Sequence, residues 1–211
     1  MKFPLLNIDG SKTNSIEISD KLVKLKVNYK LIKFVIDWQL NHLNPRVART
    51  KQRNEIKGST KKIVPQKGGG GARHSSRKAP LFVGGGVAHG PKGAVYKIKK
   101  INKKVKKLAL AQTLSKKNID KNLHILADVT KEVKKTKEFN KFLEKNNLLN
   151  VLIISDENSL KNINKSARNI KNVKVIKYEG TNIYDIFKYK DLIITSSSAI
   201  KLQERVLNEK N

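Results

Sequence analysis

Two glycine runs are the first features of this sequence that could do chemistry: Gly68–Gly71 in "VPQKGGGGARHSS" and Gly84–Gly86 in "FVGGGVAHGPK". A phosphate-binding P-loop has the pattern G-x-x-x-x-G-K-[ST], in which backbone amides and the lysine hold the phosphates. Gly85 and Gly90 have that glycine spacing, but a proline and then a lysine follow where the lysine and the hydroxyl residue belong. The dinucleotide fingerprint G-x-G-x-x-G fails as well, since arginine or histidine stands at its last glycine. The glycines therefore do not predict a nucleotide site.

Other groups that could support catalysis or bind a metal are scattered. His42, His74, His89 and His124 are far apart in the sequence, and there is no cysteine. A zinc site needs several such ligands at short, regular spacings. The hydroxyl run Thr195–Ser198 is typical of a strand end followed by a helix N-cap. We predict no catalytic residue, no metal site, no cofactor and no enzyme activity, and we keep a phosphate-handling enzyme as an alternative.

The charge of the chain indicates what it binds. Its 211 residues carry 46 lysines and arginines against 17 acids, a net charge of +29. Such self-repulsion is most easily tolerated when the normal partner is a polyanion, so nucleic acid is the first candidate and an anionic membrane the second. No stretch approaches the roughly 18 apolar residues of a membrane span, and the N-terminus does not resemble a targeting peptide. We therefore expect a cytoplasmic protein.

Most of that charge lies in the middle of the chain. Residues 45–117 contain 21 lysines and arginines and a single acid, Glu55. Residues 45–96 show neither helical nor strand periodicity, so they are predicted to be an irregular segment that orders on a polyanion. Extended basic chain can follow an RNA backbone, and glycine lets the protein backbone approach it closely. The alternative is a solvated basic loop without a fixed partner.

The flanking sequence predicts a folded body. Apolar spacing indicates helices over residues 28–43 and 101–117, and in the second of these Ile101, Val105, Leu108 and Ala111 are expected to form the buried stripe. Short β-branched runs indicate strands, and helical segments alternate with them. The expected strands are 3–8, 15–18, 123–129, 150–155, 173–178 and 191–196, and the expected helices between and after them are 136–147, 159–169, 183–188 and 199–207. We predict an α/β fold: a small, mostly parallel sheet flanked by helices, with a long irregular basic extension inserted between two helices.

Three segments in fixed order resemble one known family. They are "ARTKQRNEIKGSTKK" (48–62), "QKGGGGARHSSRKAPLFVGGGVAHGPKG" (66–93) and "INKKVKKLALAQTLSKK" (101–117). Together they are similar to the bacterial large-subunit ribosomal protein number four, the universal uL-four family. The C-terminal half agrees, so the resemblance covers essentially the whole chain.

The resemblance implies a structural constituent of the large ribosomal subunit that binds large-subunit rRNA and aids early subunit assembly. Residues 1–44 and 97–211 would form the α/β body, and residues 45–96 the loop that threads through rRNA. The tip of that loop would line the nascent-peptide exit tunnel with Gln66, Lys67, Gly68 and Gly69. The implied rRNA-binding residues are Arg46, Arg49, Lys51, Arg53, Lys57, Lys61, Lys62, Arg73, His74, Arg77, Lys78, Lys92, Asn102, Lys103 and Lys104.

The implied partners are large-subunit rRNA, neighbouring large-subunit ribosomal proteins and the nascent peptide at the loop tip, with no membrane. The sequence departs from the family pattern mostly near the tip. The departing residues are Val64, Pro65, Gly69, Gly71, Ser75 and His89. The alternative that stays open is a stand-alone RNA-binding regulator of messenger translation or transcription.

Overall fold

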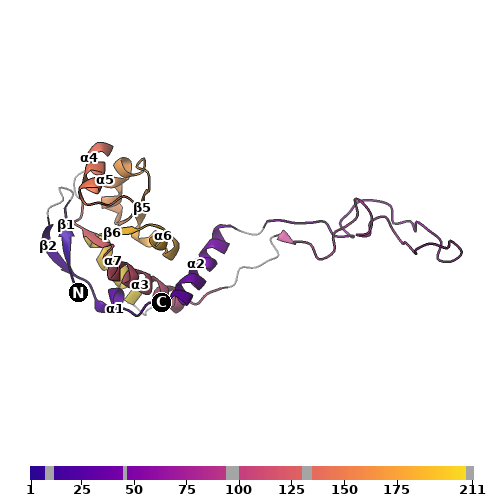
Figure 1. The fold of residues 1–211 in the computed structure, drawn as a ribbon, viewed down its shortest axis with the longest axis horizontal. Helices are drawn as coiled ribbons and strands as arrows, with labels where there is room; N and C mark the ends of the chain where they lie inside the picture. The colour runs from indigo at the N-terminus through magenta and orange to yellow at the C-terminus, as the bar shows by residue number, and fades with distance from the viewer. Residues whose placement is uncertain (8–11, 45–46, 94–99, 130–134, 208–211) are drawn as a thin grey trace. The chain divides into compact units, whose positions relative to one another are not determined.

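The computed structural model describes residues 1–7, 12–44, 47–93, 100–129 and 135–207. Contacts divide the chain into two units: Met1–Leu40 with Lys100–Asn211, and Asn41–Lys99. The first unit is the layered α/β body drawn in Figure 1, and the second is an irregular loop with no helix or strand between residues 47 and 93 apart from one isolated bridge. The loop leaves helix α2 (Tyr29–Leu43) and rejoins the body at helix α3 (Lys103–Ile119), which confirms the predicted insertion between two helices.

In the described part of the chain the sheet has six strands in the order β2-β1-β3-β6-β4-β5. Only the β1–β2 pair is antiparallel, so the prediction of a mostly parallel sheet is confirmed. The strands are β1 (Lys2–Leu6), β2 (Lys12–Glu17), β3 (Leu123–Leu126), β4 (Val151–Ser155), β5 (Val173–Lys177) and β6 (Asp191–Thr195).

Helices cover both faces of this sheet, as the alternation of strand and helix patterns predicts. Besides α2 and α3 they are α1 (Asp20–Val23), α4 (Thr136–Lys145), α5 (Glu157–Ala167), the 3-10 turn η2 (Tyr178–Gly180), α6 (Ile183–Lys188) and α7 (Ser196–Leu207). Strand β6 runs directly into α7, so the hydroxyl run at residues 195–198 is a strand end and a helix start, as predicted.

The central strands are buried on both sides because successive side chains point to opposite faces. Ile153 packs with Phe139 of α4 and Ile163 of α5 in one apolar cluster. Its neighbour Leu152 packs with Leu114 of α3 in the other. Figure 1 shows α4 and α5 on one side of the sheet and α1, α3 and α7 on the other. This double burial explains why β4 is apolar over most of its length.

We expect Ile153→Val, which deletes one methyl group from a fully buried site, to lower the free energy of unfolding by about 0.5–1.5 kcal/mol. The matched control is Ile200→Val on α7, where the side chain is 52% exposed and the change should stay within about 0.5 kcal/mol. Urea denaturation followed by circular dichroism measures both values. Equal effects of the two substitutions would show that the sheet is not the core.

The buried side of α3 differs from the predicted stripe. Leu108 is 46% exposed, whereas the next residues Ala109 and Leu110 are buried. The prediction of a buried Leu108 was wrong because polar residues share the inward face and disguise the apolar pattern. Two of these polar side chains satisfy their hydrogen bonds internally: Thr113 Oγ1 donates to the carbonyl of Ala109 at 2.7 Å, and Ser115 Oγ donates to that of Leu22 at 3.2 Å.

Lys117 on the same helix is nearly buried, and its side chain links α3 to Tyr189 and Lys190, the two residues before β6. Its Nζ donates hydrogen bonds to the carbonyl oxygens of Tyr189 at 2.6 Å and Lys190 at 2.9 Å. Burial lowers the pKa of the Lys117 ammonium from its ordinary value, because removal from water disfavours the charged form. The two carbonyls compensate part of that cost.

An ion pair joins the end of β4 to α7. Lys201 Nζ lies 2.7 Å from Asp156 Oδ1, and the Asp156 side chain is 17% exposed. The hydrogen bond from Lys201 lowers the pKa of Asp156 from its ordinary value of 3.8. The pair therefore stabilises the fold above that ordinary pKa, and the stabilisation is lost as pH falls through the lowered folded-state pKa.

We expect Asp156→Asn to reduce the free energy of unfolding at pH 7 by roughly 0.5–1 kcal/mol, because Lys201 is partly solvated. The difference from the parent protein should shrink as pH falls below the ordinary pKa of 3.8, because the parent carboxyl is protonated first in the unfolded state and then, at lower pH, in the folded state. Denaturation curves at pH 7 and pH 3 measure it. A difference of the same size at both pH values would contradict the ion-pair explanation.

Candidate nucleic-acid interface

The loop unit has two arms, one before and one after the glycine run Gly68–Gly71, and they are joined where they begin. Arg49 and Lys92 form an isolated antiparallel bridge, and the amide of Thr50 donates to the carbonyl of Pro91 at 2.9 Å. The bridged side chains are both cations and both are exposed. The structure thus brings together two predicted rRNA-binding residues that are 43 positions apart in the sequence.

Further along, the arms touch through glycine. The amide of Val87, next to Gly86, donates to the carbonyl of Lys51 in the other arm at 2.9 Å. A Cβ atom at Gly86 would lie only 2.7 Å from the Cα of Arg53 and 2.7 Å from the carbonyl carbon of Gln52, a separation that real Cβ atoms do not show. Gly85 and Gly90 are similarly crowded. These three glycines therefore serve contacts within the loop itself, and the expected close approach of the loop backbone to RNA stays a prediction.

The only acid among residues 45–117, Glu55, forms its contacts within the loop. Glu55 Oε1 lies 2.6 Å from Arg49 Nη2, and its other carboxylate oxygen accepts a hydrogen bond from the amide of Gln52 at 3.1 Å. The hydrogen bond from Arg49 lowers the pKa of Glu55, with the amide of Gln52 as the next contribution. The carboxylate is therefore ionised at neutral pH and stabilises a bend.

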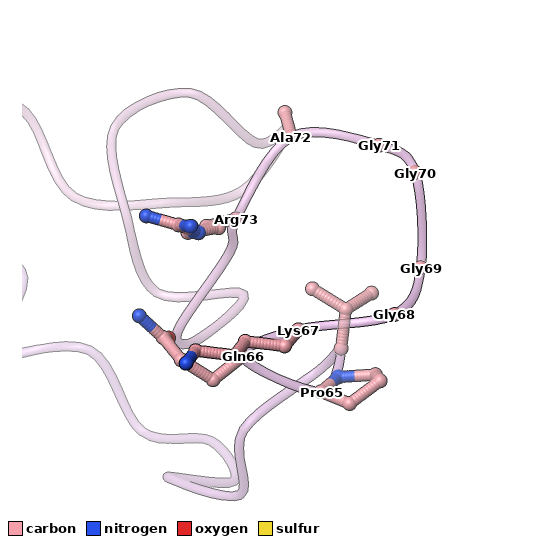
Figure 2. Close-up of a pocket in the computed structure, with 10 residues that line it drawn as sticks. Pro65, Gln66, Lys67, Gly68, Gly69, Gly70, Gly71, Ala72 and Arg73 are labelled. Carbon is pink, nitrogen blue, oxygen red and sulfur yellow. The ribbon is translucent and has the colours of Figure 1, made fainter.

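The glycine run forms the turn at the far end of the loop (Figure 2). The amide of Gly71 donates to the carbonyl of Gly69 at 2.7 Å, and Gly70 between them has a φ of +62°, which is the geometry of a tight three-residue turn. Only glycine adopts this conformation without strain. Residues 64–73 line a concavity, and the side chains of Gln66, Lys67 and Arg73 extend back on the same side of the glycine arc.

Most residues predicted to bind rRNA are exposed to solvent. The exposed ones are Arg49, Lys51, Arg53, Lys57, Lys61, Lys62, Arg73, Arg77, Lys92, Asn102, Lys103 and Lys104. All four predicted tip residues are exposed too, and Lys62 Nζ donates to Gln66 Oε1 at 2.6 Å. His74 and Lys78 are half-buried, and Arg46 lies outside the described residues.

Three of these residues belong to the other unit. Asn102 is the N-cap of α3, and Lys103 and Lys104 lie in its first turn. On the same helix, Lys106 Nζ lies 3.6 Å from the ring centroid of Trp38 on α2, a cation–π contact between the two helices from which the loop leaves and returns. No pattern in the sequence pairs these two side chains.

Sequence reasoning also missed Ser76, which is only 4% exposed. Its hydroxyl donates to the carbonyl of Ser59 at 3.3 Å and accepts from the amide of Lys78 at 3.3 Å, so it connects the two arms. Nearby, the His74 ring packs edge-on against Phe82 with centroids 5.0 Å apart. A serine in a basic, glycine-rich segment carries no sequence signal for such a role.

The hydroxyl run at the end of β6 is also occupied by local contacts. Ser197 Oγ donates to Asp128 Oδ1 at 2.9 Å, and Thr195 Oγ1 donates to Ser198 Oγ at 2.8 Å. Within the described ranges, no group of three or more histidine, aspartate or glutamate side chains is placed to hold a metal ion. Among the same residues, no helix combines the length and apolar character that crossing a membrane requires.

Comparison with known proteins identifies the family. The model of the ribosomal protein L4/L1 family matches residues 16–205. The large ribosomal subunit protein uL4 of Pelagibacter ubique is 49% identical over 206 residues, which cover 97% of this chain and 99% of that protein. The uL4 proteins of Desulforapulum autotrophicum (38% over 201 residues, covering 95% and 96% of the two chains) and Thermotoga petrophila (37% over 225 residues, covering 97% and 95%) are also similar. The chain therefore belongs to the ribosomal protein L4/L1 family.

Proposed function

We propose that this chain is a structural constituent of the large ribosomal subunit and binds large-subunit rRNA through its loop unit. The observation that carries the proposal is the loop itself, where exposed cations surround an irregular backbone whose single acid is neutralised by Arg49. Such a surface attracts phosphate at every orientation and has too little apolar area to form a core of its own. The names of the similar uL4 proteins support the same conclusion.

In this proposal residues 1–44 and 97–211 are the body and residues 45–96 are the rRNA-threading loop. The tip segment Gln66–Gly69, which leads into the turn at Gly69–Gly71, lines the nascent-peptide exit tunnel, because it is exposed and carries no bulky apolar side chain. The protein acts in early subunit assembly and in shaping the tunnel, and it catalyses no reaction. Its partners are large-subunit rRNA, neighbouring ribosomal proteins and the nascent peptide, and its place of action is the cytoplasmic ribosome.

Hydrogen exchange tests this proposal residue by residue. In the free protein, amides of residues 66–73 should exchange about as fast as disordered chain, since the hydrogen bond from Gly71 to Gly69 is a local turn. Adding large-subunit rRNA should slow their exchange. The control amides are those of Ile153 and Ile154 in β4, which pair with strands on both sides and should be protected in both states.

The same experiment separates the alternative of a stand-alone messenger regulator. That function predicts that a messenger leader RNA protects amides of the body and leaves residues 66–73 unprotected. Protection of the loop by rRNA supports the proposal. Strong protection of the loop in the free protein, or none with rRNA, contradicts it.

A further inference from the structure

One concavity of the loop unit combines charge with apolar surface. Its volume is about 560 Å³, within the range of roughly 300–1,000 Å³ that is usual for small-ligand sites. No acid lines it, and five cations do: Lys57, Lys61, Lys62, Arg77 and Lys78. The only acid of the loop, Glu55, is held by Arg49 elsewhere.

Aliphatic side chains form the rest of its wall. Ile56, Ile63 and Val83 line the concavity, and Val83 is fully exposed while Ile63 is 36% exposed. Exposed aliphatic groups beside five cations are unusual for a purely phosphate-binding surface, because phosphate gains nothing from apolar contact. They suit a ligand that has an apolar face and an anionic group together.

The walls are fixed by the contacts that join the two arms. The amide of Ile63 donates to the carbonyl of Ser75 at 3.1 Å, and Ser76 Oγ donates to that of Ser59 at 3.3 Å. The stem of Lys78 lies over Gly58, where an added Cβ would meet Lys78 Cε at 3.6 Å. The segments that carry the cations and the aliphatic groups are therefore held side by side.

The two other concavities described in this unit lack this combination. The one at the Arg49–Lys92 bridge includes the carboxylate of Glu55. The one at the tip has only two cations, Lys67 and Arg73, and four of its ten lining residues are glycines without a side chain. The concavity around Ile63 and Arg77 is therefore the one whose chemistry points to a specific ligand.

We infer that this concavity is a binding site for a single unstacked nucleotide of RNA. The face of the base would lie against Ile63 and Val83 and stack on the planar guanidinium of Arg77, while the flanking phosphates would bind Lys57 and Lys61. Stacking of this kind tolerates any base, because every base has a π-face. The inference rests on the proposed function and deepens it: the loop selects a bulged position on the RNA as well as following its backbone.

The test uses the full chain and two RNA hairpins that have the same number of phosphates and therefore the same total charge. One hairpin has a single bulged 2-aminopurine, and the other is fully paired. We expect the parent protein to bind the bulged hairpin about tenfold more tightly and to change the 2-aminopurine fluorescence, which matches the low end of the energy for stacking one base on a protein surface. The double substitution Ile63→Ala with Val83→Ala should abolish this preference and leave the salt dependence unchanged, since no cation is removed.

The matched control is Leu81→Ala, which removes an aliphatic side chain that is 81% exposed and does not line the concavity. It should keep the tenfold preference. Circular dichroism should show the same helix and strand content in all three proteins.

Equal affinity of the parent protein for both hairpins overturns the inference and leaves the proposed function standing. Loss of the preference in Leu81→Ala as well as in the double variant also overturns it, because the effect would then not belong to this concavity. Failure of the parent protein to bind either hairpin or large-subunit rRNA contradicts the proposed function itself.

Discussion

The affinity of this protein for large-subunit rRNA is expected to fall about 10⁴- to 10⁵-fold between 50 and 200 mM salt. If ten of the 21 cations in residues 45–117 contact phosphates, the slope of log K against log salt concentration is about −7 to −9. Counterions released from the RNA cause this dependence, and the exposed loop cations are the groups that release them. Filter binding or fluorescence anisotropy over a salt series measures the slope.

Two sets of substitutions locate the effect. Replacing the exposed loop cations Lys57, Lys61, Arg77 and Lys92 with glutamine should make the slope less negative by about 3 to 4. The control replaces four exposed lysines of the body with glutamine, so that both variants lose the same charge. The control positions are Lys137, Lys141, Lys161 and Lys171. If the body set changes the slope as much as the loop set, the loop is not the main rRNA-binding element.

The second large effect is expected from Gly86→Ala. The new methyl group would overlap the backbone of Arg53 and Gln52, so the two arms of the loop must separate or shift. Overpacking of this kind costs about 1–3 kcal/mol, and we expect an affinity loss for rRNA of up to about a hundredfold. Measurement at one fixed salt concentration suffices, because the substitution changes no charge.

Gly69→Ala is the matched control. No atom lies within 4 Å of a Cβ built at Gly69, and its φ is not positive, so the free protein should accept the alanine without strain. An affinity loss at Gly69 that equals the loss at Gly86 would mean that RNA approaches the tip backbone closely and that the packing of the two arms has little importance. Retention of full affinity by Gly86→Ala would contradict the described contact between the arms.

The contrast between these glycines shows what the sequence could and could not predict. It predicted an irregular basic loop, because residues 45–96 lack any apolar period and carry twelve lysines and arginines against one acid. It could not predict that Gly86 packs against Arg53, since such a contact between distant backbone segments leaves no periodic trace. For the same reason the sequence could not predict the bridge between Arg49 and Lys92 or the buried hydroxyl of Ser76.

The body was more predictable. Strands such as β4 are continuous apolar runs, because both faces of the sheet are covered. The four-residue helix α1 was missed, since one turn is too short to show a period. The buried stripe of α3 was misplaced because Thr113, Ser115 and Lys117 face inward with satisfied hydrogen bonds, and pattern reasoning assigns such residues to the surface.

The candidate nucleic-acid interface was also predictable only in part. Charge and motif identified the cations, because composition alone marks a surface that needs a polyanion. The grouping of Lys57, Lys61 and Arg77 around Ile63 depends on how the arms pair, and only the structure shows that pairing. Family membership explains why the segments occur together in this order, and the geometry explains which side chains share one concavity.

Sedimentation tests the central claim most directly. The full chain, tagged at one end, would be recovered from the cells that produce it and followed through a density gradient at moderate salt. The proposed function predicts that it sediments with the large ribosomal subunit. Recovery of the protein at the top of the gradient, free of large subunits, would contradict the proposed function.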